Sequence, residues 1–442
     1  MSTRETLAWL RAYESRNVTF IEADGSWPIV WARARGARVW DAEGKEYLDL
    51  TAAFGVAAAG HANPRVVRAG QRQMAALLHA MGDVHPHARK AELARELSRL
   101  TFGRWGRAEA RGRAAAASRG KTIFCNSGFE AVEAALKTAR LATGKRGVIA
   151  FEGAYHGLGY GALNATHRDH FRGPFRDQLG EFGHFVAFPA RAEQVEPVCE
   201  TIGRLLRREP IGAVLLEPIQ VRGGINVPRR EFLPRLRRLC DEREALLLLD
   251  EIYTGFGRTG KWFACEWSAT VPDVICLGKA LTGGFPLSAC VGRAEVMDAA
   301  WPAASGEAIH TSTFLGHPVG CAMALAQIRE IGARRLVARS ARLGRRLLAR
   351  LAQLAAPAGS GLELSVRGAG LLAGLELTTR AGAPAGAAAL RLIKALLHQG
   401  FILLPEGQHG NVIAFTPPLT ISEEELERAV RVVEANLGRL EA

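Results

Sequence analysis

A chain of 442 residues is too long for one ordinary hydrophobic core, so we expect one large domain and one smaller domain. The apolar content of 48% and the charged content of 23% are typical of a folded, water-soluble protein, and no apolar run is long enough to cross a membrane. The net charge of +13 comes from arginines that are spread among alanines along the chain, so we expect no nucleic-acid partner.

The first hundred residues predict helices and one hairpin. The N-terminal stretch MSTRETLAWLRAYESRN is charged and helix-like, and it lacks the order of a secretory signal. The stretch ARVWDAEGKEYLDL resembles a hairpin that turns at Glu43-Gly44, and two helices should follow over 63–102. His85 and His87 have H-x-H spacing, for which a helix start is a better interpretation than a metal site, so we expect no metal.

Residues 103–121, GRWGRAEARGRAAAASRGK, hold the densest cluster of arginines in the chain. The cluster contains no aromatic residue besides Trp105, which is unlike a nucleic-acid-binding arm. We therefore interpret the segment as a solvated, mobile insertion at the surface.

From residue 121 onward, short apolar runs alternate with helical segments, and an amphipathic helix is predicted over 126–144. The apolar runs lie at 121–125, 146–153, 213–219, 244–253 and 273–278. Because these runs are apolar on both faces, they indicate a mostly parallel sheet that helices cover on both sides.

The last third of the chain has a different pattern. Residues 319–356 are rich in alanine, leucine and arginine and predict helix. Strand-like pieces then mix with helices at 386–398 and 422–439. This is an α+β pattern and predicts a second domain.

The cysteines give an expectation about the cellular compartment. They are odd in number, widely spaced and without a C-x-x-C motif: Cys125, Cys199, Cys240, Cys265, Cys276, Cys290 and Cys321. This spacing argues against a disulfide framework or a zinc site, so we expect buried free thiols in a reducing cytoplasm.

Two stretches look like nucleotide-binding motifs and fail on their context. Residues 255–261, GFGRTGK, match most of a P-loop, but Trp262 replaces the hydroxyl that holds magnesium, and no helix is predicted to follow. Residues 368–373, GAGLLA, match a dinucleotide-binding fingerprint, but a strand follows them instead of a helix. We therefore expect neither an NTPase nor a dinucleotide-binding protein.

A better candidate for an anion site is KTIFCNSGFE, where a strand ends and a helix begins. Ser127 and Glu130 have the spacing of a capping box, and Gly128 allows a ligand to approach the backbone closely. Free N–H groups and the helix dipole at such a turn favour a phosphate group. On this stretch alone, an ordinary capped helix without a ligand is the better interpretation.

Two charged residues sit at the ends of apolar runs. Asp250 ends a run of leucines, and Lys279 ends the next apolar run. A carboxylate at the carboxyl edge of such a sheet lies where ligands bind, and a partly desolvated lysine can form a Schiff base with a carbonyl group. Together with a phosphate site, these are the groups that pyridoxal 5'-phosphate (PLP) needs.

At this point the chain resembles the class III (ω-type) aminotransferases, which are PLP enzymes of fold type I. The resemblance rests on LLLDEIYTGFGRTGKWFACE and PDVICLGKALTGGFPLSA, and weaker matches extend it over nearly the whole chain. It implies an α/β fold with a mixed, mostly parallel sheet in a large PLP-binding domain over 56–325. Both termini, 1–55 and 326–442, would form the smaller α+β domain.

The resemblance implies a role for each residue that matches the family's motifs. Lys279 forms the Schiff base with PLP and moves a proton, and Asp250 keeps the pyridine nitrogen protonated. Tyr155 and Ile252 flank the cofactor ring. The phosphate is held by Ser127, Gly128 and Phe129, and by Thr313 of a neighbouring subunit, which implies a homodimer or a tetramer. The enzyme would carry an amino group by a ping-pong reaction, through pyridoxamine phosphate, from an amine or (ω-)amino acid donor to a 2-oxo acid acceptor.

The chain departs from the family at positions that affect the substrate. Phe129 replaces a small or hydroxylated residue, and Tyr253 replaces a glutamine that bonds the cofactor's phenolic oxygen. Ala414 stands where glutamate-using members carry an arginine for the α-carboxylate, although that arginine's partner is present as Glu217. Arg222 is a candidate replacement, and Trp27 and Phe54 are expected to line the mouth of the substrate site.

Other functions share parts of this pattern. Racemases, aminomutases and decarboxylases on the same scaffold would also need Lys279 and Asp250. A basic α/β binding protein without catalysis is a remoter alternative, against which the intact Lys279 argues.

Overall fold

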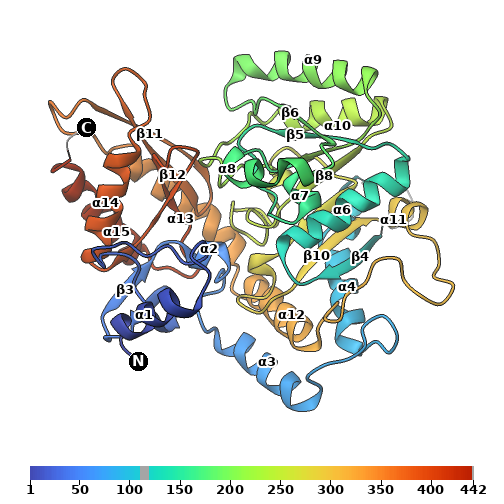
Figure 1. The fold of residues 1–442 in the computed structure, drawn as a ribbon, viewed down its shortest axis with the longest axis horizontal. Coiled ribbons are helices and arrows are strands. Elements are labelled where there is room, and N and C mark those ends of the chain that lie inside the picture. Colours follow the sequence, from blue (N-terminus) through green and yellow to red (C-terminus); the bar gives the residue numbers. More distant parts are fainter. Residues whose placement is uncertain (110–118, 441–442) are drawn as a thin grey trace.

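The structure is a computed structural model that describes residues 1–109 and 119–440. Its strands form three sheets, one of seven strands and two of four (Figure 1). Among the described residues, none of the helices is both long and apolar enough to span a membrane. All seven cysteines are buried and free, as predicted.

The seven-stranded sheet has the order β4-β10-β9-β8-β7-β5-β6. Its strands are β4 (Gly120–Cys125), β5 (Gly147–Phe151), β6 (Gly183–Val186), β7 (Ile211–Leu216), β8 (Leu246–Asp250), β9 (Val274–Leu277) and β10 (Ser288–Arg293). Strand β10 is antiparallel to both of its neighbours, whereas β6, β5, β7, β8 and β9 pair in parallel. The predicted mixed, mostly parallel sheet is therefore confirmed.

Helices cover both faces of this sheet, and the leucine run of β8 shows why. Leu248 packs in one apolar cluster with helix α6 (Gly128–Thr143). Leu247 and Leu249 pack in another, with helices α9 (Ala192–Arg208) and α10 (Phe232–Glu242). Because side chains alternate along a strand, Asp250 points to the same face of the sheet as Leu248. Helix α6 lies over this face (Figure 1).

The two ends of the chain share a sheet. The hairpin of β2 (Arg38–Asp41) and β3 (Glu46–Asp49) turns at Glu43-Gly44, as predicted. On one side β1 (Trp31–Arg35) pairs with β2, and on the other β13 (Phe401–Ile402) pairs in parallel with β3. The division of the chain into domains at residues 55 and 325 stays a prediction.

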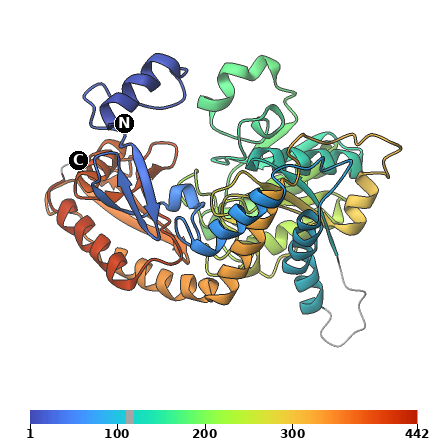
Figure 2. The ribbon, with the colours of Figure 1, turned by 90° about the horizontal axis from the view of Figure 1, so that it is seen from below.

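The C-terminal part carries the other four-stranded sheet. Its strands are β11 (Leu362–Ala369), β12 (Leu372–Thr379), β15 (Val412–Phe415) and β14 (Leu404–Glu406), in that order. Its helices are α12 (Pro318–Ala333), α13 (Leu336–Leu351), α14 (Gly386–His398) and α15 (Glu423–Leu437). Helices α12 and α13 follow one another between the seven-stranded sheet and this part of the molecule (Figure 2).

The other helices are shorter or lie earlier in the chain. They are α1 (Thr3–Tyr13), α2 (Ala52–Gly55), α3 (Pro64–Ala76), α4 (Ala88–Leu100), α5 (Phe102–Glu109), α7 (Tyr160–Leu163), α8 (Asp169–Arg172) and α11 (Ala294–Ala300). Three 3₁₀ turns are η1 (Gly173–Gln178), η2 (Ala264–Trp267) and η3 (Lys279–Leu281). His87 caps α4 through its ring, which confirms a helix start at the H-x-H stretch.

Both nucleotide-like stretches lack the helix that their motifs need. Residues 251–263 form turns and bends. In GAGLLA, Gly370 and Leu371 form the tip of the β11–β12 hairpin, and the residues on either side of them belong to its two strands. Residues 103–121 were predicted to form a solvated insertion. This prediction was wrong for the start of the segment, because Trp105 of α5 is buried against Phe102 and Phe263. Residues 110–118 of that segment lie outside the described residues.

Candidate active site

Lys279 lies directly after β9, at the start of the turn η3. Its backbone is in the left-handed region, with φ +41°, which is strained for a residue other than glycine and recurs at functional sites. Its Nζ lies 4.3 Å from the centre of the Tyr253 ring. Burial lowers the pKa of Lys279, although Asp250, Glu217 and Glu406 act in the opposite direction. A lowered pKa makes the neutral, nucleophilic amine more accessible.

Asp250 ends β8 as a buried carboxylate with defined partners. Its Oδ2 lies 2.8 Å from Nδ1 of His156, and its Oδ1 accepts a hydrogen bond from the backbone N–H of Ile252. His156 is itself buried, and its backbone N–H donates to the Thr166 hydroxyl. His156 therefore orients Asp250 and provides the partner that a buried carboxylate needs.

Ser127 is the N-cap residue of α6, directly after the turn that follows β4, and Gly128 is the first residue of the helix. The capping-box prediction was wrong, because the Glu130 carboxylate accepts from the backbone N–H of Asn126 instead and Ser127 makes no side-chain cap. The buried Ser127 hydroxyl consequently has no hydrogen-bond partner among the described residues. An added Cβ on Gly128 would lie 3.0 Å from Cδ1 of Ile252, so the turn packs closely against the strand end.

A cavity of about 430 Å³ connects these groups. It is lined by Gly128, Phe129, Tyr155, His156, Gly157, Leu158, Glu217, Arg222, Asp250, Ile252, Tyr253 and Lys279. Most of the residues that the family resemblance singles out are thus brought together at the carboxyl ends of β8 and β9. The Phe129 side chain packs on Gly157 and Gly159, where an added Cβ would clash with it, so only its backbone is available to an anion.

One wall of the cavity carries Arg222 and the buried acid Glu217, and a second buried acid, Glu406, pairs with Arg222 without lining the cavity. The Glu217 carboxylate accepts hydrogen bonds from the backbone N–H groups of Tyr155 and Val221, and burial raises its pKa to about 7. The Arg222 guanidinium lies over the Tyr155 ring, and its Nε is 3.6 Å from Oε2 of Glu406. Burial also raises the pKa of Glu406 to about 7.

Tyr253 lines another part of the cavity, and Ala414 packs near it. Tyr253 is buried, burial raises its pKa to about 12, and its hydroxyl lies 3.3 Å from that of Thr416. Ala414 is buried in the same small apolar cluster as Tyr253. The side chain at position 414 therefore offers no charge to a substrate, and no other residue of β15 carries one.

Four of the predicted residues do not line this cavity, and Ser127 is one of them, at the N-cap of α6 next to Gly128. Thr313 lies exposed in the loop between α11 and α12. Trp27 packs against the apolar cluster of Val39, Tyr47, Leu397 and Ile402. Phe54 is 48% exposed, at the end of a turn in which Ala52, Ala53 and Phe54 all have positive φ values.

Sequence reasoning missed Glu406. It ends β14 in the stretch FILLPE, where an acid follows an apolar run as Asp250 does in β8. That signal was present in the sequence. Its position beside Arg222 depends on how the C-terminal strands pack, which the sequence pattern does not reveal.

The residues present fit PLP. A lysine with a lowered pKa and a histidine-bound aspartate face one cavity, and an unbonded serine hydroxyl lies at the start of α6, where an anion is favoured. Fold and site together define a PLP-dependent enzyme with an open α/β sheet.

Comparison with known proteins identifies the family. Residues 20–437 match the family described as aminotransferase class-III, and the chain belongs to it. The acetylornithine aminotransferase of Methanosarcina acetivorans is 35% identical over 93% of this chain and 92% of its own. The putrescine aminotransferase of Pectobacterium atrosepticum is 36% identical over 99% of this chain and 89% of its own.

A solved structure agrees with this assignment. The ornithine aminotransferase of Toxoplasma gondii has a TM-score of 0.83 and 28% identity, over 99% of this chain and 95% of that one, and is described with PLP at its active site. The chain is therefore a PLP-dependent transaminase, which decides against a non-catalytic binding protein.

Proposed function

We propose that Lys279 and Asp250 are the catalytic residues of this transaminase. PLP, when bound, withdraws electrons from the carbon that carries the amino group. Lys279 would hold the cofactor and move a proton at that carbon, for which its lowered pKa suits it. Asp250, oriented by His156, would keep a proton on the pyridine nitrogen.

The remaining cavity residues and the neighbouring Ser127 would position the cofactor. The Ser127 hydroxyl and the backbone N–H groups of Gly128 and Phe129 would bind its phosphate at the start of α6. Tyr155 and Ile252 would lie against its ring, and Tyr253 would lie close to Lys279. The unbonded Ser127 hydroxyl is the observation that supports this arrangement best.

The substrate proposal rests on Ala414. Without an arginine on β15, a bidentate clamp on the α-carboxylate of glutamate or 2-oxoglutarate is missing there. We infer that the acceptor is a small oxo acid such as pyruvate and that the donor is an amine or an ω-amino acid. Arg222, whose Nε has no hydrogen-bond partner among the described residues, would bind the acceptor's carboxylate.

A panel of amino donors, each paired with pyruvate and with 2-oxoglutarate, tests this proposal. Cofactor absorbance and released oxo product would be followed for every pair. We expect kcat/KM for pyruvate to be at least equal to that for 2-oxoglutarate. A clear preference for 2-oxoglutarate would contradict the substrate proposal, and absence of any released oxo product would contradict transamination.

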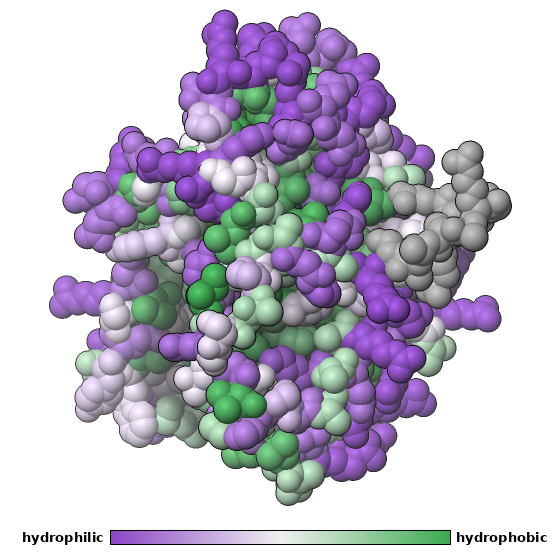
Figure 3. Space-filling model, turned by 90° about the vertical axis from the view of Figure 1, so that its right-hand side faces the viewer, coloured by the Kyte–Doolittle hydropathy of each residue, from purple (hydrophilic) through white to green (hydrophobic). Residues whose placement is uncertain are grey.

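We also propose that the enzyme is a cytoplasmic homodimer. Two segments, 77–84 and 309–314, contact each other through the rings of His79 and Phe314, and the second of them carries Thr313. Both segments carry exposed apolar side chains, which are Leu77, Leu78, Met81, Val84, Ile309 and Phe314. Figure 3 views the side of the molecule with the 301–317 loop and shows apolar side chains gathered among polar ones. A patch of this kind supports an interface through which Thr313 would reach the partner's phosphate site.

Mixing two impaired variants at limiting cofactor tests the shared site. Lys279→Ala removes the catalytic amine, and Thr313→Ala weakens phosphate binding when the cofactor is limiting. In a hybrid dimer, one site carries both substitutions and the other carries neither. We expect the refolded mixture to be more active than the sum of the two variants, and strict additivity would mean that Thr313 acts within its own chain.

A further inference from the structure

Arg222 and Glu406 form an ion pair that is poorly suited to stabilising the fold. The Glu406 carboxylate is 3% exposed, and within the described chain it accepts no hydrogen bond. Its contact with Arg222 is long, at 3.6 Å, and the Arg222 side chain remains 31% exposed. A buried charge pair repays its desolvation only with good geometry and additional hydrogen bonds, and this pair has neither.

The backbone nevertheless holds the two side chains next to each other. The N–H of Gly407 donates to the carbonyl oxygen of Arg222, which joins the end of β14 to the loop after β7. The backbone of Glu406 is thus held in place, while the Arg222 guanidinium lies over the Tyr155 ring and forms the loose ion pair. A side chain held in this way can exchange partners at little cost.

The surroundings of Glu406 are positively charged. Arg222, Lys279 and Arg168 all act on its carboxylate and partly offset the effect of burial on its pKa. Arg222 and Lys279 line the same cavity, so Glu406 lies behind the wall that faces a bound substrate. Its carboxylate is available to a cation that displaces Arg222.

The two substrates of a transaminase occupy one cavity in turn and differ in the charge of the group that does not react. An oxo acid brings a carboxylate, and a diamine brings a second ammonium group. A lone arginine would repel the diamine, and a lone glutamate would repel the oxo acid. An ion pair that can separate binds both substrates, because the oxo acid takes the place of the glutamate and the diamine takes the place of the arginine.

We propose that Glu406 binds the distal ammonium of a diamine donor and that Arg222 binds the carboxylate of the oxo-acid acceptor. This inference rests on the proposed function and adds the donor's chemical class and a residue that selects it. Glu406 is buried and in place before the donor arrives, which favours a donor with a second cationic group over an uncharged alkylamine of the same length.

The test compares donors of equal length with the holoenzyme. Butane-1,4-diamine, butan-1-amine and 4-aminobutanoate are each assayed with pyruvate. For wild type, we expect kcat/KM for the diamine to exceed that for butan-1-amine at least tenfold. An equal rate for the two amines would overturn the inference without any variant, and no turnover with any donor would instead overturn the proposed function.

Variants distinguish a role of Glu406 in choosing the donor from a role in folding. Glu406→Gln should lower the ratio of kcat/KM between diamine and butan-1-amine at least tenfold, whereas Glu363→Gln, at an exposed position on β11, should leave the ratio unchanged. Arg222→Gln should raise the KM for pyruvate at least tenfold and leave the KM for the diamine at or below its wild-type value. If Glu406→Gln slowed both amines equally, Glu406 would have only a structural role.

Discussion

At the residue scale, Glu251 shows what a buried acid does outside the cavity. It follows Asp250, is fully buried, and accepts hydrogen bonds from the Thr254 hydroxyl and from the backbone N–H groups of Ala264 and Cys265. Burial raises its pKa from 4.5 to about 7. The folded state therefore favours the protonated acid, so this carboxyl destabilises the fold when it is ionised.

The pH dependence of unfolding should reveal this carboxyl. Between pH 4.5 and 7 the folded protein holds a proton on Glu251 that the unfolded chain has lost. The free energy of unfolding contributed by this group is therefore largest below pH 4.5 and falls as the pH rises toward 7, by about 3 kcal/mol at most. Urea unfolding of wild type and Glu251→Gln at pH 5 and 7.5 measures this. The variant should lose less stability over that interval, and parallel curves would contradict the expectation.

Single residues could be predicted from the sequence where the local pattern is unusual. Asp250 and Lys279 are charges at the ends of apolar runs, and both lie in one cavity as expected. The predicted capping box at Ser127 does not form, because the Glu130 carboxylate accepts a hydrogen bond from the backbone N–H of Asn126 instead. Glu406 was missed because its partner, Arg222, lies far away in the sequence.

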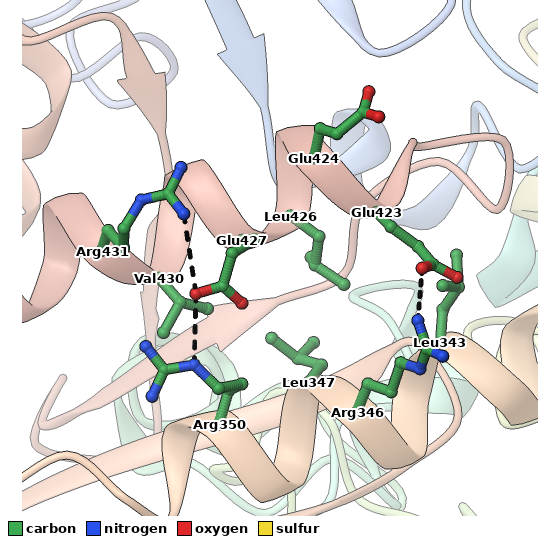
Figure 4. Close-up of a pocket in the computed structure, with 10 residues that line it drawn as sticks. All are labelled: Leu343, Arg346, Leu347, Arg350, Glu423, Glu424, Leu426, Glu427, Val430 and Arg431. Carbon is green, nitrogen blue, oxygen red and sulfur yellow. Dashed lines mark hydrogen bonds and ion pairs between the residues drawn. The ribbon is translucent and has the colours of Figure 1, made fainter.

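At the scale of elements, helices α13 and α15 pack side by side and are joined by ion pairs. Figure 4 shows Arg346 and Arg350 of α13 facing Glu423 and Glu427 of α15 across a shallow groove, with leucines between them. Glu427 also pairs with Arg431 on its own helix. These charges are partly exposed, so water and salt screen them.

Two substitutions in this helix pair separate apolar from ionic stabilisation. Leu347 is buried, so Leu347→Ala removes packed atoms and should cost about 2–5 kcal/mol of unfolding free energy. Glu427→Gln removes a screened charge and should cost about 1 kcal/mol or less. Urea unfolding of both variants compares them directly. A larger cost for Glu427→Gln would mean that the ion pairs dominate this contact.

Most elements could be predicted from hydrophobic patterns, and the exceptions have a physical reason. The runs that became β4, β5, β7, β8 and β9 are apolar and flanked by turn residues. Strand β6, with the sequence GHFV, and strand β10, with SACVGR, contain few branched apolar residues. Both strands are specified by pairing with strong neighbours, which is a tertiary effect.

At the scale of the whole molecule, Arg258 explains the stretch that resembled a P-loop. It is buried, and its Nη1 donates to the carbonyl oxygens of Leu371 and Pro417. Burial lowers its pKa to about 10. Gly370 approaches the backbone of Thr259 so closely that an added Cβ would lie 2.3 Å from its carbonyl carbon. The glycines in this stretch permit contact between backbone segments, and no phosphate is needed to explain them.

Replacing Arg258 should therefore loosen the junction between the segment after β8 and the C-terminal part. Arg258→Met removes both donors and leaves two buried carbonyl groups without a partner, which should cost about 2–5 kcal/mol. Hydrogen exchange should rise at residues 368–372 and 415–419. Arg230→Met, at an exposed position, serves as control, and equal exchange in the two variants would contradict this role.

The pairing of β3 with β13 has a consequence for synthesis on the ribosome. Strand β3 ends at Asp49, and its neighbour β13 begins only at Phe401. During most of translation the N-terminal hairpin has emerged while one of its edges remains unpaired. An open strand edge can pair with a neighbouring chain, so the nascent protein passes through a long interval in which it is exposed to aggregation. The native sheet closes only when almost the entire polypeptide is available, which makes its completion a late event in folding.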